Sequence, residues 1–530
     1  MPTANSLSQP APDRGHGLPV GLLVAGIVVV GMVAAAVALF GTTDYDEGGY
    51  AYGGWLVWTQ GWVPYRDFFT RIPPLLYYIY GIPQSVFGPS LLVARLTSTA
   101  FAGLSIGLAA VVARRLAGAW AAVAVVWLFA TSTVVMGYHF HAMAPGVTGS
   151  FVVLALVGLT WHSRPAAGAL LSGAATALMV LSRHDTAPMA GVVVAYLVLW
   201  HPAPLKHRVG ALVLAAALLT VVMVPLYHMA PDAVAYMLTV GRSAPPDVRP
   251  QAFMIGEAVN AHTMAHGLWL WTKYRAGVVV LLIGAAALAW WCRRRGSVLK
   301  LPDGTALALA VGAAQVFVCL VGIIVLRYSP STLLYPFDFW PLAVGAAVLF
   351  ASAARQTPVT FRRWGPALAP AVVGGVMAFG WGPHVGITTG RPTVLERVDS
   401  GARLIAEHTS PKDRIFTVND PHEFLQAQRV ILPELFEAFF NFRDSRSTAV
   451  LDRLRLFNRE MIQQWLSGDA NVAVVSDHSL SWVRHSGRYA GGEALYRVIQ
   501  DGLDRNYDLI AETEGTLGGR LRIYRLKASP

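Results

Sequence analysis

The stretch DYDEGG, residues 44–49, places Asp44, Asp46 and Glu47 within four positions of the chain. A carboxylate that is held beside an alcohol can take its proton in a transition state, so this cluster could supply a general base. A structural role is also open. Thr43, followed by Asp46 three residues later, resembles a helix capping box, and acids in a first helical turn complement the helix dipole.

Four glycines follow the acids closely, at Gly48, Gly49, Gly53 and Gly54. Each glycine within a helix costs up to about 1 kcal/mol relative to alanine. Capping alone does not explain them, and they indicate that another group approaches this segment closely.

The stretch PYRDFFTRIPPLLYYIYGIP, residues 64–83, supplies cations to the same loop. Pro73 and Pro74 can open a helix, and we expect an amphipathic helix that lies in the membrane interface. Arg66 and Arg71 would then lie at headgroup depth, where they could contact a lipid phosphate or simply snorkel. The prolines remove amide hydrogens, so a side chain would have to hold the phosphate. The expected apolar face consists of Leu75, Tyr78, Ile79 and Ile82.

Two further segments carry ionisable groups near the ends of apolar runs. SRHDTAP, residues 182–188, contains Arg183 and Asp185, which could serve a site or pair with each other. Asp338 precedes another apolar run and could cap the helix that it starts.

The rest of the chain determines where these groups lie. It has 530 residues, of which 55% are hydrophobic and 13% charged, and its mean hydropathy is +0.48. Apolar runs long enough to cross a hydrocarbon core of roughly 30 Å recur through the first 390 residues or so. These features predict a polytopic all-α membrane bundle of about eleven transmembrane helices. The expected spans are 19–40, 89–113, 118–137, 142–162, 166–182, 187–201, 209–229, 277–292, 303–326, 337–354 and 365–385.

The net charge of +11 is topological, because the segment from Arg391 onward carries 19 basic and 19 acidic residues. The excess lies in the membrane half, largely in alternate short loops, and basic loops stay in the cytoplasm. This pattern predicts an inner (plasma) membrane protein with a cytoplasmic N-terminus and no nucleic-acid partner. The basic residues are Arg114, Arg115, Arg164, Lys206, Arg208, Arg293, Arg294, Arg295, Lys300, Arg355, Arg362 and Arg363.

We therefore divide the chain into a cytoplasmic tail, 1–18, a membrane module, 19–389, and an extracytoplasmic domain, 390–530. Within the membrane module, the long outer loops are 41–88 and 230–276. Cys292 and Cys319 provide neither a disulfide framework nor a metal-ligand cluster.

The C-terminal domain is expected to be α/β. RIFTV (414–418), NVAVV (471–475) and LRIYRL (521–526) read as strands with β-branched cores. Helical apolar spacing is found over 394–409, 448–467 and 493–505.

Two motifs in the first outer loop resemble a known superfamily. DE-x-x-YA, here Asp46 to Ala51, and the PYRDFF…PPLLYY block are together similar to the GT-C integral-membrane glycosyltransferases. The closest branch contains the protein O-mannosyltransferases, the lipid A aminoarabinose transferase and their bacterial relatives. The resemblance implies an inverting, mannosyltransferase-like enzyme of the cell envelope. Such an enzyme moves a sugar from a polyprenyl phosphate to a glycan, lipid or protein acceptor outside the cytoplasmic membrane.

The resemblance also implies roles for residues. Asp46 matches the catalytic aspartate, Glu47 would orient it, and Asp44 is an alternative base. The departing phosphate needs cations as its charge develops. The candidate donor-binding residues are Arg66, Arg71, Arg183, Arg327 and Tyr335.

The chain departs from the superfamily pattern at two places. Relatives often carry a lysine directly before the two prolines, whereas this chain has Ile72 there, preceded by Arg71. Relatives also tend to carry an acid in the second outer loop, where this chain has His139 and His141. The two histidines could bind a divalent metal, contact phosphate or lie at a wet interface, so the resemblance implies no certain cofactor.

Two other functions fit the composition: a multi-span transporter, and an inactive GT-C relative that serves as a glycan-assembly subunit. Transporters tend to place ionisable groups near the bilayer midplane, in broken helices of an internal repeat. Here the candidate residues cluster in the outer loops, which favours the transferase.

Overall fold

The structure is a computed structural model. It describes residues 17–239, 261–295, 300–326, 336–356, 392–418, 421–437, 440–443, 447–485 and 492–528. The predicted span 365–385, the predicted domain boundary at 389/390 and most of the predicted tail 1–18 lie outside these residues.

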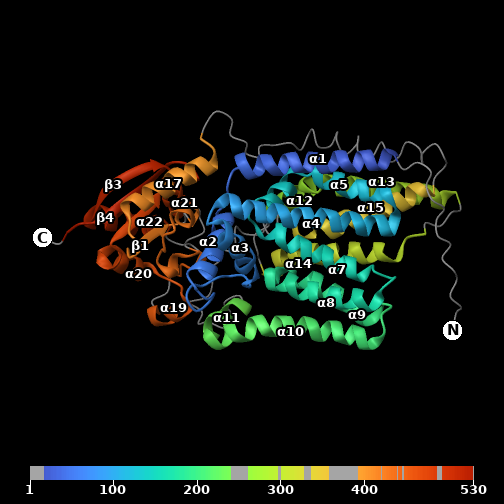
Figure 1. The fold of residues 1–530 in the computed structure, drawn as a ribbon, viewed down its shortest axis with the longest axis horizontal. Coiled ribbons are helices and arrows are strands. Elements are labelled where there is room, and N and C mark those ends of the chain that lie inside the picture. Colours follow the sequence, from blue (N-terminus) through green and yellow to red (C-terminus); the bar gives the residue numbers. More distant parts are fainter. Residues whose placement is uncertain are drawn as a thin grey trace.

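A bundle of helices forms one half of the molecule, and its members run roughly side by side (Figure 1). These helices carry apolar side chains on every face, as is typical of helices that are surrounded by other helices and by lipid. The long helices are α1 (Gly17–Phe40), α4 (Leu91–Ala117), α5 (Ala119–Thr131), α7 (Ala144–Leu159), α8 (Pro165–Ser182), α9 (Ala187–Leu199), α10 (Leu205–Met229), α13 (Ala276–Arg294), α14 (Asp303–Leu326) and α15 (Phe339–Arg355). Shorter elements between them are α6 (Thr133–Phe140), η1 (His184–Thr186), α11 (Pro231–Leu238), α12 (Ala261–Tyr274) and η3 (Pro336–Asp338).

Seven of the described helices are long and apolar enough to cross a membrane, and α5 with α6 forms an eighth if that bent pair is one span. The chain is therefore a multi-pass membrane protein. The predicted span 118–137 is in fact bent by 85° between α5 and α6. The predicted spans 142–162 and 187–201 contain the shorter helices α7 and α9, so the count of about eleven stays a prediction.

The segment predicted as the first outer loop, 41–88, contains two helices, α2 (Tyr45–Thr59) and α3 (Leu75–Phe87), which pack against each other. The predicted capping box at Thr43 is wrong. Asp44 is the N-cap residue of α2, and its side chain accepts a hydrogen bond of 3.0 Å from the Asp46 amide. Thr43 instead donates to Glu47 at 2.8 Å.

Three of the four glycines on α2 do mark close approaches. A Cβ on Gly54 would lie 2.6 Å from the backbone nitrogen of Gly81, so α2 and α3 meet backbone to backbone. A Cβ on Gly53 would lie 2.5 Å from the ring of Tyr77, and one on Gly48 would lie 2.8 Å from the ring of His422.

The helix α3 packs into the protein with Leu76, Tyr77 and Tyr80, which are buried. The tyrosine hydroxyls find partners there: that of Tyr77 donates to Glu437, and that of Tyr80 donates to the Met143 carbonyl. Ile82 of the predicted apolar face is exposed, so this face remains open to a membrane, and the interfacial position of α3 stays a prediction.

The described residues from 392 to 528, here called the C-terminal unit, contain one four-stranded mixed sheet. Its strands are β1 (Ile415–Val418), β2 (Val472–Ser476), β3 (Tyr507–Glu514) and β4 (Arg520–Leu526), in the order β1-β2-β4-β3. β1 and β2 are parallel, with Ile415 opposite Val472, and the other two pairings are antiparallel. β1 and β2 are buried throughout, which explains their β-branched composition.

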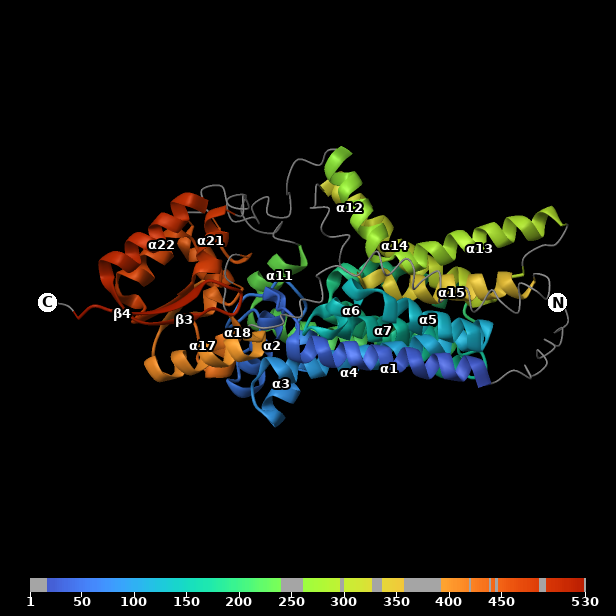
Figure 2. The same cartoon turned by 90° about the horizontal axis from the view of Figure 1, so that it is seen from above.

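Helices cover both faces of this sheet (Figure 2). The helices of the C-terminal unit are α17 (Val394–His408), α18 (Pro421–Ala427), α19 (Thr448–Leu454), α20 (Arg459–Gln464), α21 (Asp477–His485) and α22 (Gly492–Asn506), with the short helices η4 (Pro433–Leu435) and η6 (Trp465–Asp469). The three predicted strands are confirmed, and β3 was missed. The continuous helix predicted over 448–467 is wrong, because the chain turns at Arg455, whose φ is 55°.

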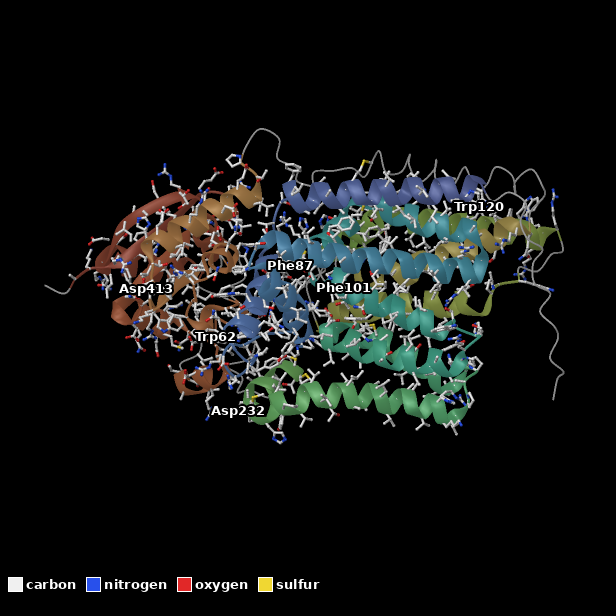
Figure 3. All side chains as sticks on the ribbon, viewed as in Figure 1. Trp62, Phe87, Phe101, Trp120, Asp232 and Asp413 are labelled. Atoms are coloured by element: carbon white, nitrogen blue, oxygen red, sulfur yellow. The ribbon has the colours of Figure 1, made fainter. Side chains whose placement is uncertain are left out.

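The C-terminal unit lies at one end of the bundle, and α2 and α3 lie between the two (Figures 1 and 2). Figure 3 places Asp413 on the C-terminal unit and Trp120 at the opposite end of the bundle. Tyr52 on α2 ties the parts together: its hydroxyl donates to the Arg429 carbonyl at 3.0 Å and accepts from the Ile431 amide at 3.1 Å.

Candidate active site

The three acids of the first loop lie in different environments. Asp44 keeps accessible surface, Asp46 is half-buried and Glu47 is fully buried. Burial raises the pKa of Asp44, the charges of Asp46 and Glu47 raise it further, and the hydrogen bond from the Asp46 amide lowers it, which leaves a pKa of about 7. Asp44 has accessible surface, yet enough protein surrounds it to weaken its hydration.

Glu47 forms a buried ion pair with Arg95 of α4, and both side chains are fully buried. Arg95 donates through Nε to Oε1 at 2.8 Å and through a terminal nitrogen to Oε2 at 2.9 Å. Oε1 also accepts from the Ala142 amide at 3.0 Å and Oε2 from the Thr43 hydroxyl at 2.8 Å. Burial by itself raises the pKa of Glu47, but Arg95 and these hydrogen bonds outweigh it and lower the pKa to about 2. Glu47 therefore has no surface open to a substrate.

Arg95 also caps the carboxyl end of α1. It donates to the carbonyls of Val37 at 3.2 Å and Ala38 at 3.3 Å, within the last turn of that helix, and to that of Thr42 at 2.8 Å. A cation at this place complements the negative end of the helix dipole. The Glu47–Arg95 pair thus fixes the start of α2 to the ends of two bundle helices.

Arg183 faces the same region from the end of α8. It donates to the Tyr50 hydroxyl at 3.1 Å and holds the Asp185 carboxylate with two bonds, at 3.2 and 2.7 Å. Burial raises the pKa of Asp185, but Arg183 outweighs it and lowers that pKa. The predicted Arg183–Asp185 pair is therefore present, and Tyr50 extends it to α2.

The candidate base Asp46 and the candidate cations Arg183 and Arg71 all act on the Tyr50 hydroxyl. Burial raises the pKa of this phenol, Asp46 raises it further, and Arg183 and Arg71 lower it. Asp46 lies one helical turn before Tyr50 on α2, and Arg183 donates directly to the Tyr50 hydroxyl. Arg71 is linked less directly, through Glu437 and Tyr77, whose ring centre lies 6.2 Å from that of Tyr50.

Arg71 is held by a residue of the C-terminal unit. Its Nε donates to Glu437 at 3.1 Å, and its guanidinium carbon lies 3.4 Å from the centre of the Phe440 ring. Tyr77 of α3 donates to the other Glu437 oxygen at 3.2 Å. The Arg71 side chain remains about one third exposed, at 35%. It therefore has surface left for a ligand.

Arg66 lies further out. It is exposed and paired with its neighbour Asp67, with a bond of 2.9 Å from its Nε. Its backbone carbonyl accepts from Arg455 of the C-terminal unit at 3.0 Å. Among the described residues, no hydrogen bond or ion pair joins Arg66 to Tyr50 or Arg183, so Arg66 lies outside the cluster.

His139 and His141, which were predicted to lie in the second outer loop, are buried. His139 uses both ring nitrogens within the protein: Nδ1 donates to the Val135 carbonyl at 2.7 Å, and Nε2 accepts from Trp340 at 2.9 Å. His139 therefore has no nitrogen left for a metal or a phosphate. His141 is buried near Glu47. Among the described residues, no three histidine, cysteine or acidic side chains gather as metal ligands would.

Arg327 and Tyr335 lie outside the described residues, so their predicted role stays a prediction. Asp338 occupies the N-cap position of α15, as predicted, but its side chain makes no capping hydrogen bond. It forms a buried ion pair with Arg275, whose Nε lies 2.9 Å from Oδ2, and it accepts from Trp271 at 3.0 Å.

Sequence reasoning missed three residues that shape this region: Arg95, His422 and Glu437. Arg95 had a usable signal, since an arginine inside the predicted span 89–113 should mark a partner or a function. His422 and Glu437 had none, because their partners lie more than 360 positions away along the chain.

The fold and the site define an integral-membrane protein with an acid-and-arginine cluster between its helical bundle and an α/β unit. Residues 71–228 match the model of the dolichyl-phosphate-mannose-protein mannosyltransferase family. No curated protein matches the sequence with statistical significance.

Two solved structures have a similar fold over almost the entire chain. ArnT from Cupriavidus metallidurans bound to undecaprenyl phosphate is 14% identical, with a TM-score of 0.55 over 97% of this chain and 100% of ArnT. The arabinofuranosyltransferase AftD from Mycobacteria is 15% identical, with a TM-score of 0.50 over 96% of this chain and 40% of AftD. The resemblance to the GT-C superfamily of membrane glycosyltransferases is thereby confirmed.

Proposed function

We propose that this protein is an inverting glycosyltransferase that moves a sugar from a polyprenyl-phosphate donor to an acceptor on the outer side of the cytoplasmic membrane. The observation that carries the proposal is the arrangement around Tyr50. Asp46 lies one helical turn before it, Arg183 donates to its hydroxyl, and Arg71 is linked to it through Glu437 and Tyr77. The displacement of a phosphate by an alcohol requires a base for the alcohol and cations for the departing phosphate. The acid and the two arginines of this cluster could supply both.

In the proposed reaction, the acceptor oxygen attacks the anomeric carbon of the donor. The bond from that carbon to the phosphate oxygen breaks, and its electron pair leaves with the phosphate. Asp46 takes the proton of the acceptor hydroxyl, while Arg183 and Arg71 stabilise the charge that develops on the phosphate. A lipid phosphate is a good leaving group, so the reaction needs no separate general acid.

The lipid-linked donor is supported by the similarity to ArnT, whose structure holds undecaprenyl phosphate. In this chain, Arg183 and Arg71 would contact the phosphate. Arg71 is held by Glu437 in this structure, so the phosphate would compete with that carboxylate for the guanidinium. Glu47 acts as a positioning residue, since it is buried and fixes the turn that carries Asp44 and Asp46.

The orientation in the membrane is supported by the basic residues at the end of the bundle away from the C-terminal unit. Arg355 donates to the carbonyl of Ala117, three positions before Trp120, which Figure 3 labels at this end of the bundle. The guanidinium carbon of Arg115 lies 5.7 Å from the centre of the Trp161 ring. Basic ends stay in the cytoplasm, so the C-terminal unit and the acidic site would face outward.

Asp46→Asn tests the assignment of the base. We expect it to lower kcat for transfer from a labelled polyprenyl-phosphate sugar by about a hundredfold to ten-thousandfold, since that is the usual contribution of a general base. Asp44→Asn is the matched variant. It keeps the helix cap, because asparagine caps as well as aspartate, and it should retain most of the activity.

The reverse result, with Asp44→Asn inactive and Asp46→Asn active, would assign the base to Asp44. If both variants transfer sugar at the wild-type rate, the proposed chemistry is wrong. The donor is best identified from the lipid-linked sugar that accumulates in a deletion strain.

A further inference from the structure

A histidine of the C-terminal unit contacts the turn that carries the acids. His422 of α18 is fully buried, and its Nε2 lies 2.9 Å from the Thr43 hydroxyl oxygen and 3.0 Å from the Asp44 carbonyl oxygen. The two residues that it reaches immediately precede α2. The contact joins parts of the chain that are separated by 379 positions.

The surrounding bonds determine which atom donates. The Asp44 carbonyl can only accept a hydrogen bond, and the Thr43 hydroxyl gives its own hydrogen to Glu47 at 2.8 Å. Nε2 of His422 must therefore carry the proton and donate to both oxygens. Burial lowers the pKa of His422, which is consistent with a neutral ring.

The helix α2 has a glycine where the His422 ring packs against it. Gly48 lies one turn along α2, and a Cβ there would lie 2.8 Å from three atoms of the His422 ring. The same turn is fixed from the other side by the Glu47–Arg95 pair. The turn is thus held between a bundle helix and the C-terminal unit.

We propose that His422 is a positioning residue, which holds the Thr43–Asp44 turn so that Asp46, two residues further on, keeps the placement that catalysis needs. This inference rests on the proposed function for its catalytic part. It gives the C-terminal unit a direct part in the site, through a hydrogen bond and not through packing alone. His422 itself touches neither donor nor acceptor.

The experiment compares His422→Leu, which fills much of the space without a donor, with His422→Gln, whose amide can replace the Nε2–H bond. His485→Leu is the control, because His485 is exposed and hydrogen-bonds to Ser481 within α21. Two quantities are measured on the full-length protein. They are hydrogen exchange of the amides in the first turn of α2, and kcat and KM for transfer from a labelled polyprenyl-phosphate sugar.

We expect His422→Leu to speed the exchange of these amides and to lower kcat by about ten- to a hundredfold, since a displacement of about 1 Å can have that effect. KM for the donor should stay near the wild-type value, because the arginines that would contact the phosphate are unchanged. His422→Gln should recover most of both losses, and His485→Leu should match the wild type.

Wild-type exchange and wild-type kcat in His422→Leu would overturn the inference, and so would equal losses in the Leu and Gln variants. If His422→Leu does not fold, Gly48→Ala replaces it. Its Cβ displaces the ring from the other side, and an unchanged kcat there would again overturn the inference. If the wild type transfers no sugar while exchange responds as expected, the hold on the turn stands and the proposed function falls.

Discussion

At the scale of single residues, neighbouring carboxylates acquire different properties from their surroundings. The pKa of Asp44 is about 7 and that of Glu47 about 2, although only two residues separate them. The difference arises because Arg95 outweighs the effect of burial on Glu47, whereas burial is the largest cause at Asp44 and the charges of Asp46 and Glu47 add to it. One acid is therefore fixed as an anion, and the other can change its charge near neutral pH.

The raised pKa of Asp44 predicts a pH-dependent effect on stability. The folded protein holds this proton up to about pH 7, whereas an ordinary aspartate loses it at 3.8, so the contribution of the group is fully present below 3.8 and is lost as pH rises to about 7. Asp44→Asn should therefore gain in melting temperature relative to wild type as pH rises from 5 to about 7. Thermal unfolding in detergent across this range measures the difference. If the variant gains the same in melting temperature at every pH, the raised pKa of Asp44 is contradicted.

The Glu47–Arg95 pair predicts strong coupling. Glu47→Gln or Arg95→Met alone leaves a buried charge without its partner and should cost about 3–5 kcal/mol of unfolding free energy. The double variant Glu47→Gln/Arg95→Met should cost clearly less than the sum of the two single effects. Unfolding of all variants in the same detergent completes the cycle, and simple additivity would show that the two charges do not depend on each other.

At the scale of elements, the contact between α2 and α3 depends on a pair of glycines. Gly54→Ala would put a methyl group 2.6 Å from the Gly81 backbone, which cannot move aside as a side chain can. We expect a loss of about 1–3 kcal/mol in stability.

Gly49→Ala is the matched control on the same helix. A Cβ on Gly49 would meet no atom within 4 Å among the described residues, apart from its chain neighbours and the backbone of its own helix. It should therefore be neutral or stabilising by up to about 1 kcal/mol, as expected for glycine to alanine in a helix. Equal melting temperatures for the Gly54 and Gly49 variants would show that the helices can separate without cost.

At the scale of the whole molecule, the two ends of the bundle should lie on opposite sides of the membrane. Ser410 in the C-terminal unit and Ser163 between α7 and α8 are both exposed. With Cys292 and Cys319 replaced by alanine, Ser410→Cys should react with an impermeant maleimide in intact spheroplasts. Ser163→Cys should react only after permeabilisation. The opposite pattern would reverse the proposed orientation and place the acids in the cytoplasm.

The sequence by itself determined the membrane class, most of the apolar helices, three of the four strands, and the acidic and basic residues of the first loop. These features follow from local properties: hydrophobic length, residue periodicity and charge bias are readable over a few turns of chain. The resemblance carried by DE-x-x-YA and the PYRDFF block supplied the expected superfamily.

Only the tertiary structure decided which acid is buried, which arginine meets Tyr50, and which residues of the C-terminal unit hold the first loop. Glu47 and Asp46 are adjacent acids in the sequence, and nothing local shows that one of them meets Arg95 of α4. Glu437 and His422 reach their partners across more than 360 residues. Such contacts depend on how the C-terminal unit packs on α2, and a pattern within one segment carries no information about that packing.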